Sequence, residues 1–199
     1  MLRAALLIAS LLAADVTVAA AQTPTRIRGT IESATGQALT IKSREGQTVT
    51  VTLAPNFAVV AVSKASLGDI KSGTFVGAAA LPQSDGTFKA QEVLVFPEAM
   101  RGSNEGHYPW DLSPGSTMTN AAVTAMVSGN DGTALTLKHK DGEVKVVVPQ
   151  AVPIVTLGPG DKSLLVPGAG VFVPASKAAD GALSAGRVLV GKDGVMPPM

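Results

Sequence analysis

"ALTIKSREGQTVTVTL", residues 38–53, contains two runs of alternating polar and apolar residues around a turn. On both sides of the turn Glu45-Gly46, threonine or lysine alternates with leucine, isoleucine or valine, a pattern typical of strands that bury one face. A near copy, "ALTLKHKDGEVKVVV", occupies residues 134–148, with the turn Asp141-Gly142. The sequence therefore predicts two related β-hairpins.

The similarity continues beyond the hairpins. "DGTFKA" at 85–90 and "VLV" at 93–95 recur in the same order as "DGALSA" at 180–185 and "VLV" at 188–190. Matches before the hairpin turn are 96 residues apart and later ones are 95 apart, so one residue was gained or lost near Gln47. A one-residue slip elsewhere would turn a strand over. The chain therefore holds tandem copies of one unit, at 27–97 and 121–191.

Each unit is predicted to form short strands without long helices, except for one helical turn at 66–73. A five- or six-stranded unit of about 70 residues is small for an immunoglobulin-like sandwich and suits a small barrel of the oligonucleotide-binding-fold or SH3-like kind. The fold class predicted is all-β, with two tandem small barrels. The predicted strands are 27–33, 38–43, 48–53, 58–63, 75–81, 88–96, 123–128, 134–139, 144–148, 152–157, 170–174 and 183–190. The predicted organisation is a signal peptide (1–21), a first barrel (22–97), an ordered connector (98–120), a second barrel (121–191) and a C-terminal tail (192–199).

The first residues predict export. "MLRAALLIASLLAADVTVAAAQ" has a positive start, an apolar run shorter than a membrane span, and three alanines before Gln22, which is typical of a signal peptide cut after Ala21. No later segment is long and apolar enough to span a membrane. The predicted location is thus the periplasm or the exterior.

Composition excludes several partners and chemistries. The formal net charge is +1, so there is no electrostatic reason to expect nucleic acid or anionic lipid. The chain has no cysteine, which rules out disulfides, thiolate metal sites and cysteine nucleophiles.

Nearly all of the chain after residue 21 resembles small exported β domains of bacteria that form a domain family of unknown function. The resemblance lies in "IRGTIESATGQALTIKSREGQTVTVTL", "SLGDIKSG", "DGTFKAQEVLVF", the connector "EGHYPWDLSPGSTMTN" and the ending "GKDGVMPPM". It implies small periplasmic β-barrels, and it supplies no established catalytic residues to assign to this chain. Some members carry the label of a metal ABC transporter permease, which does not fit a chain without several spanning helices.

Catalytic constellations are scarce, so we predict no enzymatic activity and no cofactor. His107 and His139 are the only histidines, and His139 is expected to be an exposed turn residue. Ser116, His107 and Asp111 could be combined as a hydrolytic triad, but no nucleophile elbow accompanies them.

Metal binding is an alternative. His107 with Glu105, Asp111 or Asn104 would supply nitrogen and oxygen ligands for Zn²⁺ or Cu²⁺, whereas thioethers suit Cu⁺. The thioether candidates are Met100, Met118 and the terminal pair Met196 and Met199, which two prolines separate.

The connector holds the only Trp and the only Tyr of the chain. A segment of that length with large apolar rings is typical of an ordered element. It is predicted either to seal the seam between the barrels or to form a ligand or interface patch from His107, Tyr108, Trp110 and Asp111. We therefore predict a non-enzymatic binding or accessory protein, with an envelope protein, a peptide or a small molecule as partner. The alternatives are a copper- or zinc-binding protein and a self-associating structural protein of the envelope.

Overall fold

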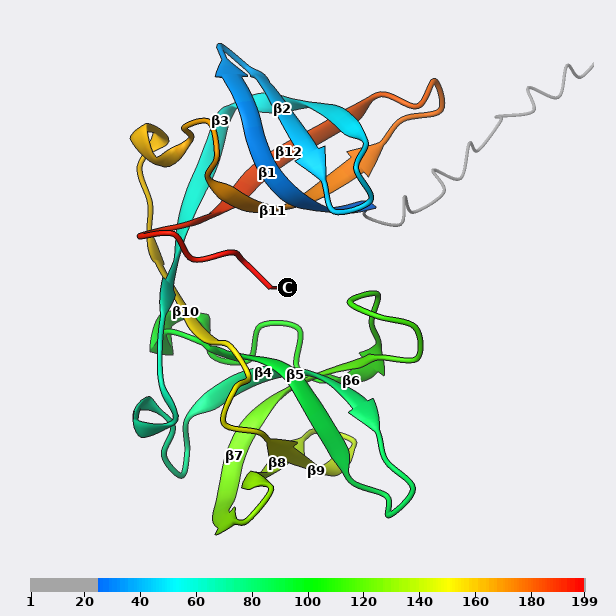
Figure 1. Ribbon diagram of the computed structural model, residues 1–199, viewed down its shortest axis with the longest axis vertical. Helices are drawn as coiled ribbons and strands as arrows, with labels where there is room; N and C mark the ends of the chain where they lie inside the picture. The colour runs from blue at the N-terminus through cyan, green and yellow to red at the C-terminus, as the bar shows by residue number, and fades with distance from the viewer. Residues whose placement is uncertain (1–24, 199) are drawn as a thin grey trace, which may run out of the picture.

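The structure, a computed structural model, describes residues 25–198 (Figure 1). The predicted signal peptide and Met199 lie outside the described residues. The strands are β1 (Thr25–Thr35), β2 (Ala38–Ser43), β3 (Thr48–Lys64), β4 (Phe75–Pro82), β5 (Phe88–Val95), β6 (Gly106–Pro109), β7 (Thr117–Gly129), β8 (Gly132–His139), β9 (Gly142–Val148), β10 (Ile154–Pro159), β11 (Gly170–Lys177) and β12 (Leu183–Gly191). Three 3-10 turns accompany them: η1 (Leu67–Asp69), η2 (Glu98–Met100) and η3 (Lys162–Leu164). Among residues 25–198, no helix has the length and apolar character needed to cross a bilayer.

The chain is all-β and contains a closed five-stranded barrel, which we call the first ring. β1, β2 and β3 form an antiparallel meander, β11 pairs with β1, and β12 pairs with both β11 and β3. The contact of β12 with β3 is parallel, and the others are antiparallel. The first ring is the upper lobe in Figure 1.

A second ring of strand pairings forms the lower lobe. β7, β8 and β9 make an antiparallel meander, β4 pairs with β7, and β5 pairs with β4 and, in parallel, with β9. This order matches that of the first ring, with β4 and β5 in the places of β11 and β12. The same order of strand pairing thus occurs in both rings.

The predicted assignment of one barrel to each repeat is wrong, because each ring takes strands from both repeats. The first ring combines 25–64 with 170–191, and the second combines 75–95 with 117–148. The last two strands of each predicted repeat thus complete the ring of the other, an exchange of strands. Dividing the chain at residue 97 or 121 would therefore cut through both rings.

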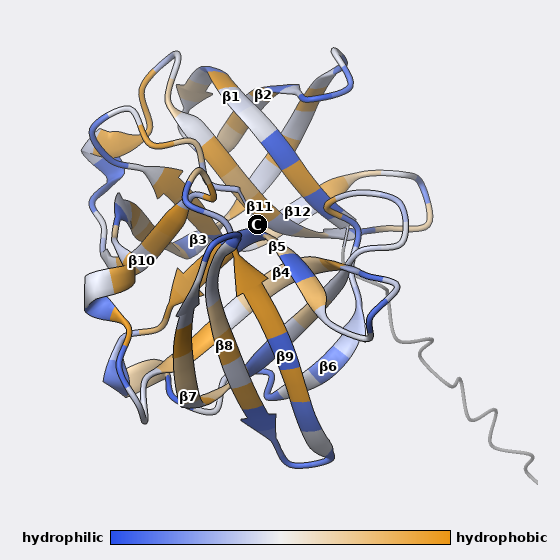
Figure 2. Cartoon of the chain, turned by 60° about the horizontal axis from the view of Figure 1, so that its bottom comes forward, coloured by the Kyte–Doolittle hydropathy of each residue, from blue (hydrophilic) through white to orange (hydrophobic). Residues whose placement is uncertain are grey.

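Each ring has its own apolar core. The alternation that predicted the hairpins places Leu39, Ile41 and Val51 in the first core, all fully buried. Their counterparts Leu135 and Leu137 are equally buried in the second. Figure 2 shows the resulting alternation of hydrophobic and hydrophilic residues along the strands. A one-residue change located at the hairpin turn leaves the corresponding strand residues facing the core in both rings.

A third apolar cluster lies between the rings, where β3 and β10 connect them. The last part of β3 pairs with β10, and β10 pairs in parallel with β5. The cluster contains Val62, Leu94, Val155, Leu157, Phe172 and Leu189. The two lobes are therefore joined by a packed junction and not by a flexible linker.

Most predicted strands and the predicted helical turn are confirmed, with differences at β3 and in the connector. The predicted strands 48–53 and 58–63 form one continuous β3, since no turn interrupts them. The predicted helical turn is η1, where the side chain of Asp69 accepts a hydrogen bond from the Ser66 amide at 2.8 Å. The connector is partly strand: β6 pairs with β7, which begins at Thr117 and not at Val123.

Candidate functional site

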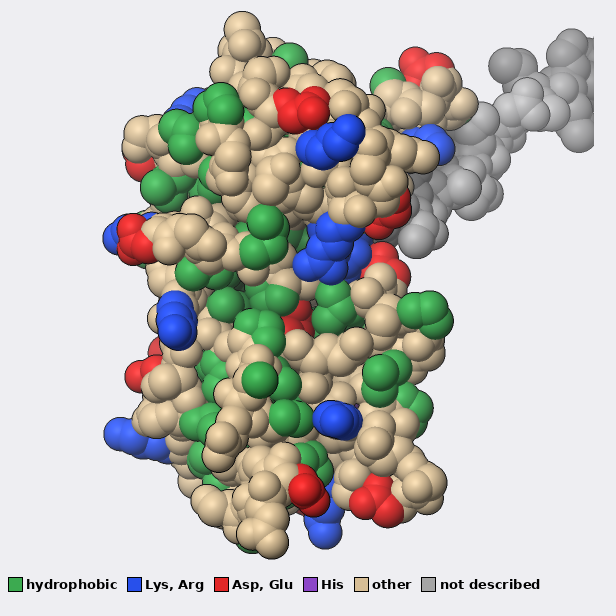
Figure 3. Space-filling model, viewed as in Figure 1, with side chains coloured by type: hydrophobic (Ala, Val, Ile, Leu, Met, Phe, Trp, Pro, Cys, Tyr) green, Lys and Arg blue, Asp and Glu red, His purple; other side chains and the backbone are tan. Residues whose placement is uncertain are grey.

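A cleft of about 820 Å³ opens between the two rings. Its floor is apolar and is largely the junction cluster: Val60, Leu94, Phe96, Leu157, Phe172 and Leu189. The space-filling view in Figure 3 shows the molecule narrowed between the lobes, with hydrophobic side chains gathered there. A cleft of this volume with mainly apolar walls is typical of a small-ligand site.

The connector supplies one wall of this cleft through Tyr108 and Trp110. β6 holds Tyr108 in place by pairing it with Met118, and the Tyr108 hydroxyl accepts a hydrogen bond from Asn120 Nδ2 at 3.0 Å. After β6, the Trp110 amide donates to the carbonyl of Ser116 at 2.8 Å, which closes a turn. The two aromatic rings meet edge to face, with centroids 6.1 Å apart.

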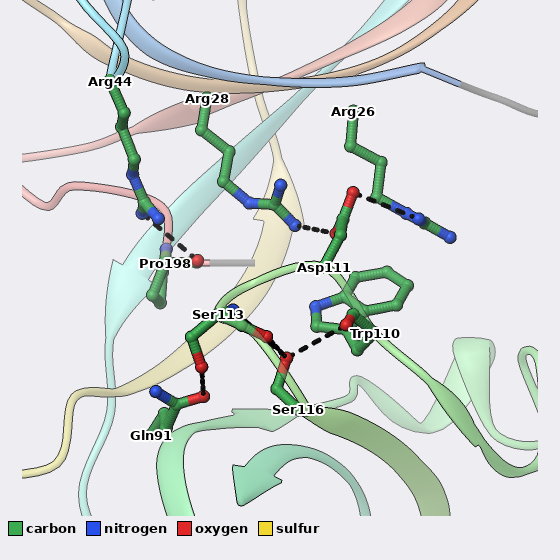
Figure 4. A network of polar contacts seen from close by, with 9 residues as sticks. All are labelled: Arg26, Arg28, Arg44, Gln91, Trp110, Asp111, Ser113, Ser116 and Pro198. Atoms are coloured by element: carbon green, nitrogen blue, oxygen red, sulfur yellow. Dashed lines mark hydrogen bonds and ion pairs between the residues drawn. The ribbon is translucent and has the colours of Figure 1, made fainter.

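Trp110 and Asp111 reach across to β1 of the first ring (Figure 4). The Arg26 guanidinium lies 4.0 Å from the centre of the Trp110 ring, a cation–π contact. Asp111 accepts a hydrogen bond from Arg28 at 2.7 Å and lies 3.3 Å from Arg26. Burial raises the pKa of the Asp111 carboxyl, but the hydrogen bond and charge of Arg28 and the charge of Arg26 outweigh it and lower the pKa overall. The connector therefore links the two rings through ion pairs and a cation–π contact.

We expect Asp111→Ala to lower the free energy of unfolding by about 1.5–3 kcal/mol, the usual contribution of a hydrogen bond to a charged group. The reason is that Arg28, only 8% exposed, loses its carboxylate acceptor. Urea denaturation measures the change. Asp141→Ala is the matched control, because its ion pair with Lys140 is exposed on both sides and such pairs contribute little. An equal decrease in the free energy of unfolding in both variants would contradict a stabilising contact between Asp111 and Arg28.

Two charged side chains of the cleft are without a partner among residues 25–198. Arg187, on β12, belongs to the first ring, and Glu105 precedes β6 on the side of the second. Neither forms an ion pair or a side-chain hydrogen bond with a described residue. Arg26, by contrast, is already paired with Asp111.

His107 does not belong to the cleft, so the predicted patch is divided. Its Nδ1 lies 2.8 Å from the Thr119 hydroxyl, and its ring packs edge-on against Phe88 and is stacked near His139, with centroids 6.3 Å apart. Burial, and then the charge of His139, lower the pKa of His107. His139 was expected to be an exposed turn residue, but it is half-buried at the end of β8. Tyr108, Trp110 and Asp111 remain at the cleft and its edge.

The residues predicted to hold a metal are dispersed. Among residues 25–198, no three His, Asp or Glu side chains gather in a way that could hold an ion. Met100 and Met118 line the cleft, whereas Met196 is 47% exposed near Gly170. Met199 lies outside the described residues.

Glu92 is a buried acid beside the junction cluster that could not be predicted from the sequence. It is 1% exposed, and neither carboxylate oxygen has a hydrogen-bond partner among the described residues. β5 has an irregular register beside it, so Ala90 and Val93 face the second core while Glu92 and Leu94 face the junction. Burial raises the pKa of Glu92 to about 8, against the opposing charges of Arg28 and Arg44. The alternation of the strand gave no hint of a buried acid.

Comparisons with protein-family models, with curated proteins and with solved structures found no match to this chain. The resemblance to the exported domain family therefore stays a prediction. The functional proposal depends on the geometry of the cleft.

Proposed function

We propose that this protein is an exported, non-enzymatic binding protein that holds a small ligand in the cleft between its rings. The observation that carries the proposal is the cleft itself: an open space of about 820 Å³ with an apolar floor and the single Trp of the chain on its wall. Ligand sites often lie between domains and combine apolar surface with a few polar groups. The connector would then serve both predicted purposes, as a seam and as a binding wall.

We also propose that both rings are barrels of the oligonucleotide-binding-fold class. In the first ring the meander of β1, β2 and β3 is followed in the chain by β11, which lies beside β1. This is the Greek-key order, and the oligonucleotide-binding fold is a five-stranded Greek-key barrel. The second ring has the same spatial order, with β4 beside β7, but its β4 and β5 precede the meander in the chain. The fold class alone does not choose a ligand.

A ligand screen with two readouts tests the function. A compound bound in the cleft is expected to change the fluorescence of Trp110 and to raise the melting temperature, since binding to the folded state alone stabilises it. Met100→Ser alters the cleft lining and should weaken binding. Val127→Ser is the control, because Val127 is 65% exposed and does not line the cleft. If no compound in a broad screen of metabolites and peptides acts on both readouts, the proposal is wrong.

Export is tested separately. When the full chain is produced in a Gram-negative bacterium, we expect it in the periplasmic fraction with Gln22 as its first residue. Cell fractionation and mass spectrometry of the intact protein measure both. A cytoplasmic product that retains residues 1–21 would contradict this part of the proposal.

A further inference from the structure

We infer that the ligand of the cleft is a short apolar peptide with both termini free. This inference rests on the proposed function, because it names the ligand class of the same site. It follows from three properties of the cleft: its unpaired charges, its apolar floor and its volume.

The unpaired charges are one of each sign, and they come from elements that belong to different rings. Arg187 comes from the first ring, and Glu105 comes from the connector on the side of the second ring. A ligand with a single anionic group would satisfy Arg187 and leave Glu105 repelling it. A single cation would do the reverse. A ligand with a carboxylate at one end and an ammonium at the other is complementary to both.

The origin of the two charges in different rings favours some length between the ends of the ligand. In a free amino acid, ammonium and carboxylate are attached to the same carbon, whereas a peptide separates them. Each further residue extends a peptide by roughly 3.3–3.6 Å. A volume of about 820 Å³ lies within the range of sites for small ligands, which favours two to four residues.

The floor between the charges favours apolar side chains. Leu157, Phe172 and Leu189 belong to the junction cluster and also line the cleft. Apolar side chains of a peptide would bury this surface, which is favourable in proportion to the area removed from water. Binding near Trp110 would also change the surroundings of its ring, so its fluorescence reports occupancy directly.

The test uses the mature chain and four forms of one probe: trileucine, its N-acetyl form, its C-terminal amide and the doubly blocked form. Titrations followed by Trp110 fluorescence give four affinities. We expect blocking either end to weaken binding by about tenfold or more. An apolar anion, decanoate, is titrated alongside as the rival ligand class.

Two variants assign the ends. In Arg187→Ala, amidation should no longer weaken binding while acetylation still does, and in Glu105→Gln the opposite should hold. Lys145→Ala and Glu143→Gln are matched controls, since both side chains are exposed and unpaired on β9 and neither lines the cleft. Both controls should keep the penalties of the unchanged chain.

Three results would overturn the inference. Equal affinity for all four probes shows that the termini are not recognised. Tighter binding of decanoate, dependent on Arg187 alone, assigns an anionic amphiphile instead. Absence of any response to trileucine at millimolar concentration, while another compound binds with the sensitivity to Met100→Ser described above, refutes the peptide and leaves the proposed function standing.

Discussion

Raising the pH from 5 to 9 is expected to destabilise this protein through Glu92. The ordinary pKa of the carboxyl is 4.5, and burial raises it to about 8 in the folded chain. Between these values the folded chain holds a proton that the unfolded chain has released, so the free energy of unfolding falls as the pH rises. The slope is about 1.4 kcal/mol for each pH unit, and it ends near pH 8, where the folded chain also releases the proton.

Glu92→Gln should remove this slope, because the amide is neutral at every pH and nearly the same size. Urea denaturation at pH 5, 7 and 9 gives the free energy of unfolding of the variant and of the unchanged chain. The difference between the two at each pH isolates the contribution of Glu92, because groups such as His107 contribute equally to both. Glu143→Gln is the control, since that side chain is exposed. A Glu92→Gln variant with the same pH dependence as the unchanged chain would show that Glu92 is ionised in the folded state.

Cutting the connector is expected to leave the two halves bound to each other. A protease site inserted between Arg101 and Gly102 lies in an exposed turn, where insertions are tolerated. After cleavage, β11 and β12 still pair with β1 and β3, and β4 still pairs with β7. Each ring therefore holds strands of both fragments, and separation would open both rings.

Size-exclusion chromatography of the cleaved protein shows whether the two fragments stay associated. A single peak containing both fragments in equal amounts is expected in buffer, and two separate components are expected in concentrated urea. The uncut protein carrying the same insertion is the control. Two folded fragments that elute separately in buffer would mean that each repeat closes its own barrel, as the sequence alone suggested.

The strands could be predicted from the sequence because their pattern is local. Alternation in the hairpin at 38–53 places Leu39 and Ile41 inside, and both are fully buried. The exchange of strands could not be predicted, because a local pattern does not say which distant strands pair. β11 and β12 carry nearly the same pattern as β4 and β5, so either pair could complete the first meander. Only contacts distant in sequence distinguish the two pairings.

The candidate site was predicted in part. Rarity of aromatic residues pointed to Tyr108 and Trp110, and the structure places both at the cleft. The partners of the connector on β1 are far away in sequence: Arg28 is 83 residues from Asp111, and no local pattern links the two. His107 was grouped with Trp110 because of their proximity in the chain, yet strand β6 directs it to a different environment, beside Phe88 and His139.

The exchange of strands also affects the order in which the protein can fold during synthesis. Domains commonly fold from the N-terminus as the chain emerges from the ribosome. Here Thr25 pairs with Ala175, and the first ring closes only when β12, which ends at Gly191, is available. Contacts of such long sequence separation slow folding. The first strands of the chain therefore wait for almost the last ones before the first ring can close, whereas every strand of the second ring lies between residues 75 and 148.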